Sequence, residues 1–193
     1  HKLDELDFAG VRIFLEPKNF RLTTALGAEE QKNLSILLGA MRIRYHLLIG
    51  NRKEAEAAYL AAVDLGSDYQ VSQLKGGLFL QISRYLATRG ETHIAMQWVK
   101  KAVLQYQGAG SAAEEREATV ELGGILLAEG RLAEALEYFN LAGQSDPQAL
   151  TVGGLRLAAL RATVLFIQGN LSRAQTETQS GLAQARALKR REW

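Results

Sequence analysis

The side chains in this sequence that could do chemistry are arginines, glutamates and three histidines, and their spacing limits what they can do. Arg44 and Arg84 lie one 40-residue interval apart, and two guanidinium groups related in this way suit carboxylates or phosphates. The histidines, at positions 1, 46 and 93, are scattered. None forms an i, i+4 pair around a Glu, and no Asp or Glu cluster has metal-ligand spacing. The pattern therefore favours binding of acidic groups over metal-dependent catalysis.

Motifs for nucleophilic and phosphate chemistry are not found either. The sequence has no G-x-S-x-G elbow and no G-x-x-x-x-G-K-[ST] loop. It has no cysteine, which excludes a disulfide framework, a thiolate zinc site and a cysteine nucleophile. Paired glycines in "KGGLFL", "ELGGILL" and "VGGLRL" fall inside helical stretches, where close helix packing explains them better than a phosphate loop does. We therefore predict that the chain is not an enzyme and needs no metal or cofactor.

Composition and charge narrow the class of partner. The chain has 193 residues, of which 47% are apolar and 23% are charged, which is typical of a soluble protein with one core or an extended array. The 23 basic and 21 acidic residues give a formal net charge of +2, too small to indicate a nucleic acid or a membrane surface as partner. No basic segment followed by an apolar run opens the chain. We expect a cytoplasmic protein, and we expect these residues to be a piece of a longer chain.

A segment that begins with a glycine recurs four times along the chain. The glycines are Gly50, Gly90, Gly130 and Gly169, with spacings of 40, 40 and 39 residues. The fifth and twelfth residues after each glycine are small, and residues seven apart share one helix face. These small residues are Ala55 and Ala62, Ala95 and Ala102, Ala135 and Ala142, Ala174 and Gly181.

Each repeat has the pattern of two helices joined by a glycine turn. In three copies a bulky residue, Tyr59, Val99 or Phe139, lies between the two small ones, as expected where a helix packs closely on a partner. Apolar residues at intervals of three and four also precede each glycine. We expect the glycine to take the left-handed conformation that ends the first helix of its pair.

The third copy resembles the tetratricopeptide repeat (TPR). The matching residues lie in both helices and in the turn: Leu122, Gly123, Gly130, Ala135, Phe139, Ala142 and Pro147. The usual period of the family is 34 residues. The longer period of this chain is similar to that of kinesin light chains, cell-polarity adaptors and the sensor regions of bacterial maltose-activator-type transcription regulators.

The resemblance implies an all-α fold, a right-handed superhelix (α-solenoid) of stacked antiparallel helix pairs. Four repeats are expected in residues 31–187. Residues 1–30 are expected to hold an N-terminal helix and a connector, and residues 188–193 the truncated start of a further helix or repeat. The stretch "QGAGSAAEE" is expected to form a loop around Gly108 to Ser111 that links the second and third repeats, whose helices still stack across it.

In this family the first helices line a concave groove, and the resemblance implies which residues face it. Two ladders of equivalent positions run across the repeats: Met41, Gln81, Glu121 and Leu160, then Arg44, Arg84, Gly124 and Thr163. Leu80 and Phe166 are expected to add apolar surface, and Glu117 lies one turn before Glu121. The expected partner-binding residues are therefore Met41, Arg44, Leu80, Gln81, Arg84, Glu117, Glu121 and Phe166.

Two functions stay open from the sequence. The leading hypothesis is a protein–protein interaction scaffold that binds a peptide or helix with acidic groups in the groove. The alternative is a regulatory domain of a multidomain bacterial transcription regulator, in which the repeats take a small effector or a second regulator. A structural role competes with both, since the two arginines could instead pair with neighbouring glutamates such as Glu121 and serve solubility.

Overall fold

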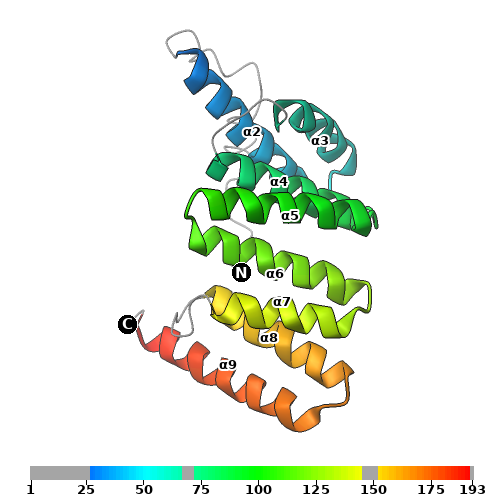
Figure 1. The fold of residues 1–193 in the computed structure, drawn as a ribbon, viewed down its shortest axis with the longest axis vertical. Coiled ribbons are helices and arrows are strands. Elements are labelled where there is room, and N and C mark those ends of the chain that lie inside the picture. Colours follow the sequence, from blue (N-terminus) through cyan, green and yellow to red (C-terminus); the bar gives the residue numbers. More distant parts are fainter. Residues whose placement is uncertain (1–26, 67–71, 145–151, 192–193) are drawn as a thin grey trace.

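The computed structural model describes residues 27–66, 72–144 and 152–191, and within them the chain forms helices and short turns. Figure 1 shows these helices stacked one after another along the long axis of the molecule. They are α2 (Ala28–Leu48), α3 (Arg52–Gly66), α4 (Ser72–Thr88), α5 (Thr92–Gly108), α6 (Ala112–Ala128), α7 (Leu132–Gln144), α8 (Val152–Ile167) and α9 (Leu171–Arg191).

The helices pack as four pairs, α2 with α3, α4 with α5, α6 with α7 and α8 with α9, and each pair packs on the next. Short turns reverse the chain within each pair, so the two helices of a pair are antiparallel (Figure 1). The all-α solenoid of stacked antiparallel helix pairs is therefore confirmed.

Glycine ends the first helix of each pair, as expected. Gly50, Gly90, Gly130 and Gly169 have φ between 70° and 78°, a conformation that a side chain disfavours. The residue after each glycine donates its N–H to the carbonyl five positions earlier, over 2.8 to 3.0 Å. This is the Schellman motif, which satisfies carbonyl groups that a helix end leaves without partners.

The expected loop around Gly108 to Ser111 is present as a tight turn between α5 and α6. Helix α5 continues to Gly108 and α6 begins at Ala112, and Gly110 between them has a φ of 66°. The N–H of Ser111 donates to the Tyr106 carbonyl over 2.9 Å, so the same tight turn is used between these pairs as inside them. The small residues of this stretch end one helix and begin the next, and the three residues 109–111 join the second and third repeats.

The start of the first described helix differs from the expected boundary. Helix α2 begins at Ala28, inside the expected connector, because the Glu30 carboxylate accepts the backbone N–H of Gly27 over 2.9 Å and caps the first turn. Residues 188–191 lie within α9. The expected helix at 2–16 and the proline at position 147 lie outside the described residues.

Small residues let the helices of a pair approach closely. Ala55, Ala62, Ala95, Ala102 and Ala135 are fully buried, as the seven-residue spacing predicts.

Two of the glycines inside helices have the same role. A Cβ on Gly76 would lie 2.8 Å from the Tyr106 ring, and a Cβ on Gly123 would lie 2.6 Å from the Phe139 ring. Close packing is therefore confirmed for these two glycines. Gly124, in contrast, has no atom within 4 Å of such a Cβ.

Candidate partner-binding surface

Arg84 is held by two glutamates of the next repeat. Its guanidinium lies 2.8 Å from a carboxylate oxygen of Glu117 and 3.2 Å from one of Glu121. On the other side, Arg156 of α8 approaches Glu121 at 3.5 Å. We call these four residues the Arg84 cluster. It joins α4 to α6 and α6 to α8, so these first helices lie beside one another along the stack.

The Arg84 cluster is partly shielded from water. The side chains of Arg84 and Glu121 are 22% and 17% exposed. Burial alone would lower the pKa of the Arg84 guanidinium, but Glu121 and Glu117 raise it above its ordinary value. Arg84 therefore pairs with neighbouring glutamates, Glu117 and Glu121, as the structural alternative expects.

Arg44 holds the equivalent position one repeat earlier, and its surroundings differ. It is exposed and makes no ion pair with any residue that the structure describes. The partners of Arg84 lie 33 and 37 residues further along the chain. The same offsets from Arg44 lead to Gly77 and Gln81, neither of which carries a charge.

Gln81 is itself incompletely satisfied. Its side chain belongs to a residue that is 9% exposed, and its Oε1 atom is buried with no hydrogen-bond partner in the described part of the chain. A buried acceptor without a donor is uncommon in proteins. Gln81 therefore offers a hydrogen-bond acceptor to a donor from outside the described residues.

Apolar side chains flank Arg44 on an exposed face of α2. Leu37, Met41 and Leu48 are 44%, 38% and 71% exposed. Together with Arg44 they follow a spacing of four, three and four residues, which places them on one helix face. We call these four residues the α2 stripe. The sequence interpretation named Met41 and Arg44 but missed Leu37 and Leu48, which the helical spacing around Met41 could have indicated.

Two other expected contact residues lie elsewhere. Leu80 is 3% exposed and belongs to the hydrophobic core, so the expectation that it adds apolar surface is wrong. Its position next to Gln81 turns it toward the packed side of α4. Phe166 is 66% exposed, but it lines a separate hollow between α8 and α9.

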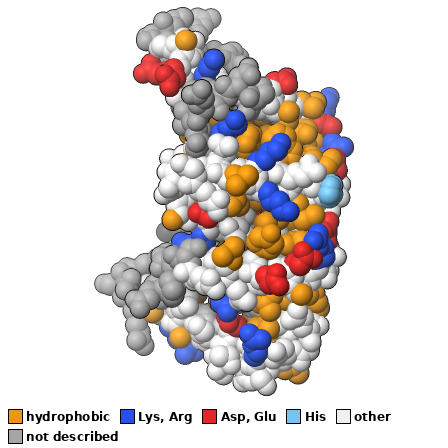
Figure 2. All heavy atoms as spheres, in the orientation of Figure 1, with side chains coloured by type: hydrophobic (Ala, Val, Ile, Leu, Met, Phe, Trp, Pro, Cys, Tyr) orange, Lys and Arg blue, Asp and Glu red, His pale blue; other side chains and the backbone are white. Residues whose placement is uncertain are grey.

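Trp98 also has a packing role. Its ring meets the Phe79 ring edge to face at 5.1 Å, so it packs within its own helix pair and not between repeats. The Lys101 ammonium lies 4.4 Å from the centre of the Trp98 ring. Figure 2 shows apolar side chains interspersed with lysine and arginine over the middle of the face in view. Such mixed surfaces occur on many soluble proteins and need no ligand.

A smaller hollow of about 260 Å³ lies among α5, α6 and α7. Its polar lining includes Lys100, Arg131, Glu134 and Tyr138. The Arg131 guanidinium contacts both carboxylate oxygens of Glu134, at 2.8 and 2.6 Å. Arg131 and Glu134 therefore neutralise each other. Lys100 is a further positive charge in the lining of the hollow.

The described residues contain neither a metal-binding group of side chains nor a membrane-spanning helix. No group of three or more His, Cys, Asp or Glu side chains there could hold a metal ion. None of the described helices combines the length and the apolar character that crossing a membrane requires.

Comparison with known proteins gives information about the fold of this chain. No family model and no curated protein matches the sequence. Among solved structures, BtubC (BKLC) from P. vanneervenii matches with a TM-score of 0.75 and 14% identity, over 93% of this chain and 72% of that one. A protein of Podosopora anserina, described as a kinesin light chain with nearly identical TPR-like repeats, matches with a TM-score of 0.68 and 13% identity, over 95% and 94%. The fold is TPR-like.

A third match concerns binding. YrrB, described as a TPR protein with an unusual peptide-binding site, has a TM-score of 0.58 and 16% identity and covers 97% of this TPR-like chain and 98% of its own. At such identities the likeness concerns the fold alone. The α2 stripe and the Arg84 cluster must therefore be interpreted from their own geometry.

Proposed function

We propose that this chain is a protein-interaction scaffold that binds a peptide or helix carrying an acidic group along the α2 stripe. The observation that carries the proposal is the exposed guanidinium of Arg44, which has no ion pair among the described residues. Exposed Met41 lies one turn before it and exposed Leu48 one turn after it. A charge between two apolar contacts suits one acidic residue flanked by apolar ones.

The geometry also indicates how such a partner would be held. An arginine can take a carboxylate through two parallel hydrogen bonds. On a helical peptide, the residues three or four positions before and after the acidic residue would meet Met41 and Leu48.

The ladder positions equivalent to Arg44 differ from repeat to repeat. Gly124 and Thr163 hold the positions equivalent to Arg44 in the third and fourth repeats, and Gly124 borders open space. The Arg84 cluster, with its charges already paired, lies between these positions and the α2 stripe. In this proposal the partner's acidic group contacts Arg44, and Glu121 and Glu117 contribute by keeping Arg84 occupied.

A peptide library can test this function. Peptides would be selected on the chain and then tested against the Arg44→Glu variant, with Lys53→Glu as a control that makes the same charge change on exposed α3. We expect the selected peptides to share an acidic residue with apolar neighbours, to bind less tightly as salt is added and to lose binding only to Arg44→Glu. Peptides that bind both variants equally would contradict the proposal.

The effector-sensing alternative, as in a bacterial transcription regulator, rests on the hollow beside Lys100. A small anionic effector would suit it, since a lysine and the Tyr138 side chain line one wall. A thermal shift with inorganic phosphate or small carboxylates that disappears in Lys100→Gln would support this alternative. Cytoplasmic location, the absence of catalysis and the absence of direct nucleic-acid contact stay predictions.

A further inference from the structure

The hollow beside Lys100 lies in the middle of the stack, among α5, α6 and α7, and has a volume of about 260 Å³. The first helix pair lies before it and the last pair after it (Figure 1). Its floor is apolar, because the lining residues Met96, Leu122 and Leu126 are only 8%, 3% and 2% exposed. The hollow is therefore a feature of the interior repeats.

The rim of this hollow is polar and comes from two neighbouring helices. Helix α5 contributes His93, Gln97 and Lys100, and α7 contributes Glu134 and Tyr138. Spacings of three and four residues place each set on one helix face. The side chains of His93 and Gln97 lie 3.3 Å apart and share a hydrogen bond. An apolar floor with a few polar groups around it is the usual arrangement of a small-molecule site.

Lys100 is the available positive charge of the rim, because the other one is already bound. The Nη1 atom of Arg131 lies 3.5 Å from a Glu129 carboxylate oxygen, and its other two nitrogens donate to Glu134. These hydrogen bonds lower the pKa of Glu134 below its ordinary value, and the charge of Lys100 adds to the effect. Lys100 is exposed and forms no ion pair with any residue that the structure describes.

Helix packing explains the floor of the hollow but does not explain the lysine. One leucine recurs at the same repeat position in three pairs and is 1% or 2% exposed in each: Leu86, Leu126 and Leu165. Lys100, in contrast, holds the position of Leu60 in α3 and of Asn140 in α7. The floor is therefore common to the repeats, and the charge above it belongs to this one.

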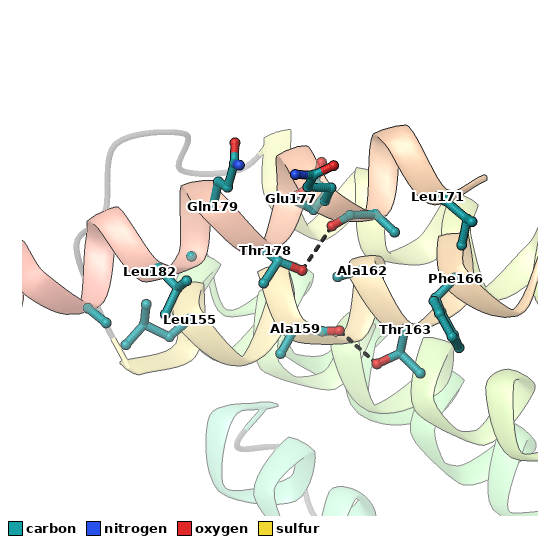
Figure 3. Close-up of a pocket in the computed structure, with 14 residues that line it drawn as sticks. Leu155, Ala159, Ala162, Thr163, Phe166, Leu171, Glu177, Thr178, Gln179 and Leu182 are labelled. Atoms are coloured by element: carbon teal, nitrogen blue, oxygen red, sulfur yellow. Dashed lines mark hydrogen bonds between the residues drawn. The ribbon is translucent and has the colours of Figure 1, made fainter. Parts of the chain in front are cut away.

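The larger hollow between α8 and α9 differs in its polar groups. Its hydroxyls, on Thr163 and Thr178, donate to carbonyls of their own helices over 2.9 Å each, as the dashed lines in Figure 3 mark. Its carboxylate, on Glu177, pairs with Arg161 at 2.9 Å. The hollow beside Lys100 is therefore the one that can recognise a ligand by its charge.

We infer that the hollow beside Lys100 binds a small monocarboxylate with a short apolar chain. One unpaired ammonium suits one carboxylate, through a charge-assisted hydrogen bond, and the chain would lie on Met96 and Leu122, away from water. The volume equals that of about nine water molecules in the liquid, which suits a ligand of a few carbon atoms. The inference rests on the effector-sensing alternative and names its ligand class. It is independent of peptide binding, which uses the α2 stripe.

A titration of the 193-residue chain with acetate, butanoate, hexanoate and inorganic phosphate tests the ligand class, with binding followed by ligand-observed NMR. We expect the affinity to rise by up to about fourfold for each added methylene group, because the longer chain covers more of the floor. Phosphate should bind no better than acetate. The series probes the floor without a substitution in the core.

A pair of lysine variants tests the location. Lys100→Gln should weaken hexanoate binding about tenfold, because it removes the charged hydrogen-bond donor. Lys101→Gln is the matched control, since it makes the same charge change on the next residue, whose ammonium lies 4.4 Å from the centre of the Trp98 ring. It should bind hexanoate like the parent chain.

Four results would overturn the inference. Equal hexanoate binding by the parent chain and Lys100→Gln would place the site elsewhere. Phosphate that binds as tightly as hexanoate, and only when Lys100 is present, would remove the apolar chain from the ligand and leave the effector alternative in place. Tighter binding of 2-aminohexanoate than of hexanoate would assign the hollow to an amino acid whose ammonium group contacts Glu134. No binding of any anion would reject the effector alternative as well, while peptide binding at Arg44 would be unaffected.

Discussion

The first helix pair and the middle of the stack use the same repeat positions in different ways. In the middle, Arg84 is bound by Glu117 and Glu121, and Gly123 fits against a ring that would clash with any Cβ. In the first pair, Arg44 has no acidic neighbour at the corresponding offsets, and Gly39 makes only ordinary contacts, at 3.6 Å or more. The middle is therefore locked by its own side chains, while the first pair keeps an arginine available for a partner.

The largest expected effect is the loss of close packing in the middle. Gly123→Ala should lower the free energy of unfolding by about 1–3 kcal/mol, because its Cβ would lie 2.6 Å from the Phe139 ring. Gly124→Ala, on the next residue, should raise it by up to about 1 kcal/mol, because alanine favours the helix and the site is open. Gly39→Ala in the first pair should not destabilise. Urea unfolding of the three variants measures this, and equal losses at Gly123 and Gly124 would refute the register of α6.

The two arginines should differ next in their effect on stability. Arg84→Ala leaves the partly buried Glu121 and Glu117 without this partner and should cost about 1–3 kcal/mol of unfolding free energy. Arg44→Ala should change it by no more than about 0.5 kcal/mol, as expected for an exposed side chain. Chemical denaturation in one buffer compares them directly. A loss at Arg44 as large as that at Arg84 would mean that Arg44 is also structural.

The substitution Gln81→Glu should give Arg44 an ion pair like the one that Arg84 makes with Glu121. Gln81→Glu places a carboxylate at the same offset from Arg44 that Glu121 has from Arg84. A double-mutant cycle with Arg44→Ala should give a favourable coupling of about 0.2–1 kcal/mol, typical of partly exposed ion pairs. No coupling would show that the side chains at 44 and 81 do not meet.

The smallest expected effect concerns His46 in the first pair. Burial lowers the pKa of His46 below 6.5, against an opposing effect of Glu54 and with a smaller contribution from Arg42. The unfolded chain then binds a proton more readily, so the contribution of His46 to stability is present above pH 6.5 and is lost as the pH falls through that value. The melting temperature between about pH 5.5 and 7.5 should depend less on pH in His46→Gln, and an unchanged slope would remove His46 as the cause.

Much of the fold could be predicted from the sequence because its signals are local. A glycine every 40 residues and small residues seven apart depend on helix geometry and turn chemistry alone. The loop around Gly108 to Ser111 was also predicted, although a run of small residues does not show how tight the turn is.

Side-chain partners were harder to predict because they depend on the neighbouring repeat. The occupied state of Arg84 follows from glutamates 33 and 37 residues away, an offset known only once the first helices are placed side by side. Leu80 was expected at the surface and is buried; it is adjacent to the ladder residue Gln81, and adjacent helical residues point about 100° apart. The role of Arg156 and the hollow of α8 and α9 needed the stacked structure.

The most direct test of Arg44 as the partner-binding arginine is a titration of one selected acidic peptide against four proteins. These are the parent chain, Arg44→Ala, Arg84→Ala and Gln81→Glu, each first shown to be folded by circular dichroism. We predict that Arg44→Ala weakens binding about tenfold, or about 1.4 kcal/mol. Gln81→Glu should weaken it by up to about fivefold, because its carboxylate competes for Arg44 with a coupling of about 0.2–1 kcal/mol. Arg84→Ala should change it by less than about twofold. Binding that is lost with Arg84 and retained without Arg44 would contradict the proposed function.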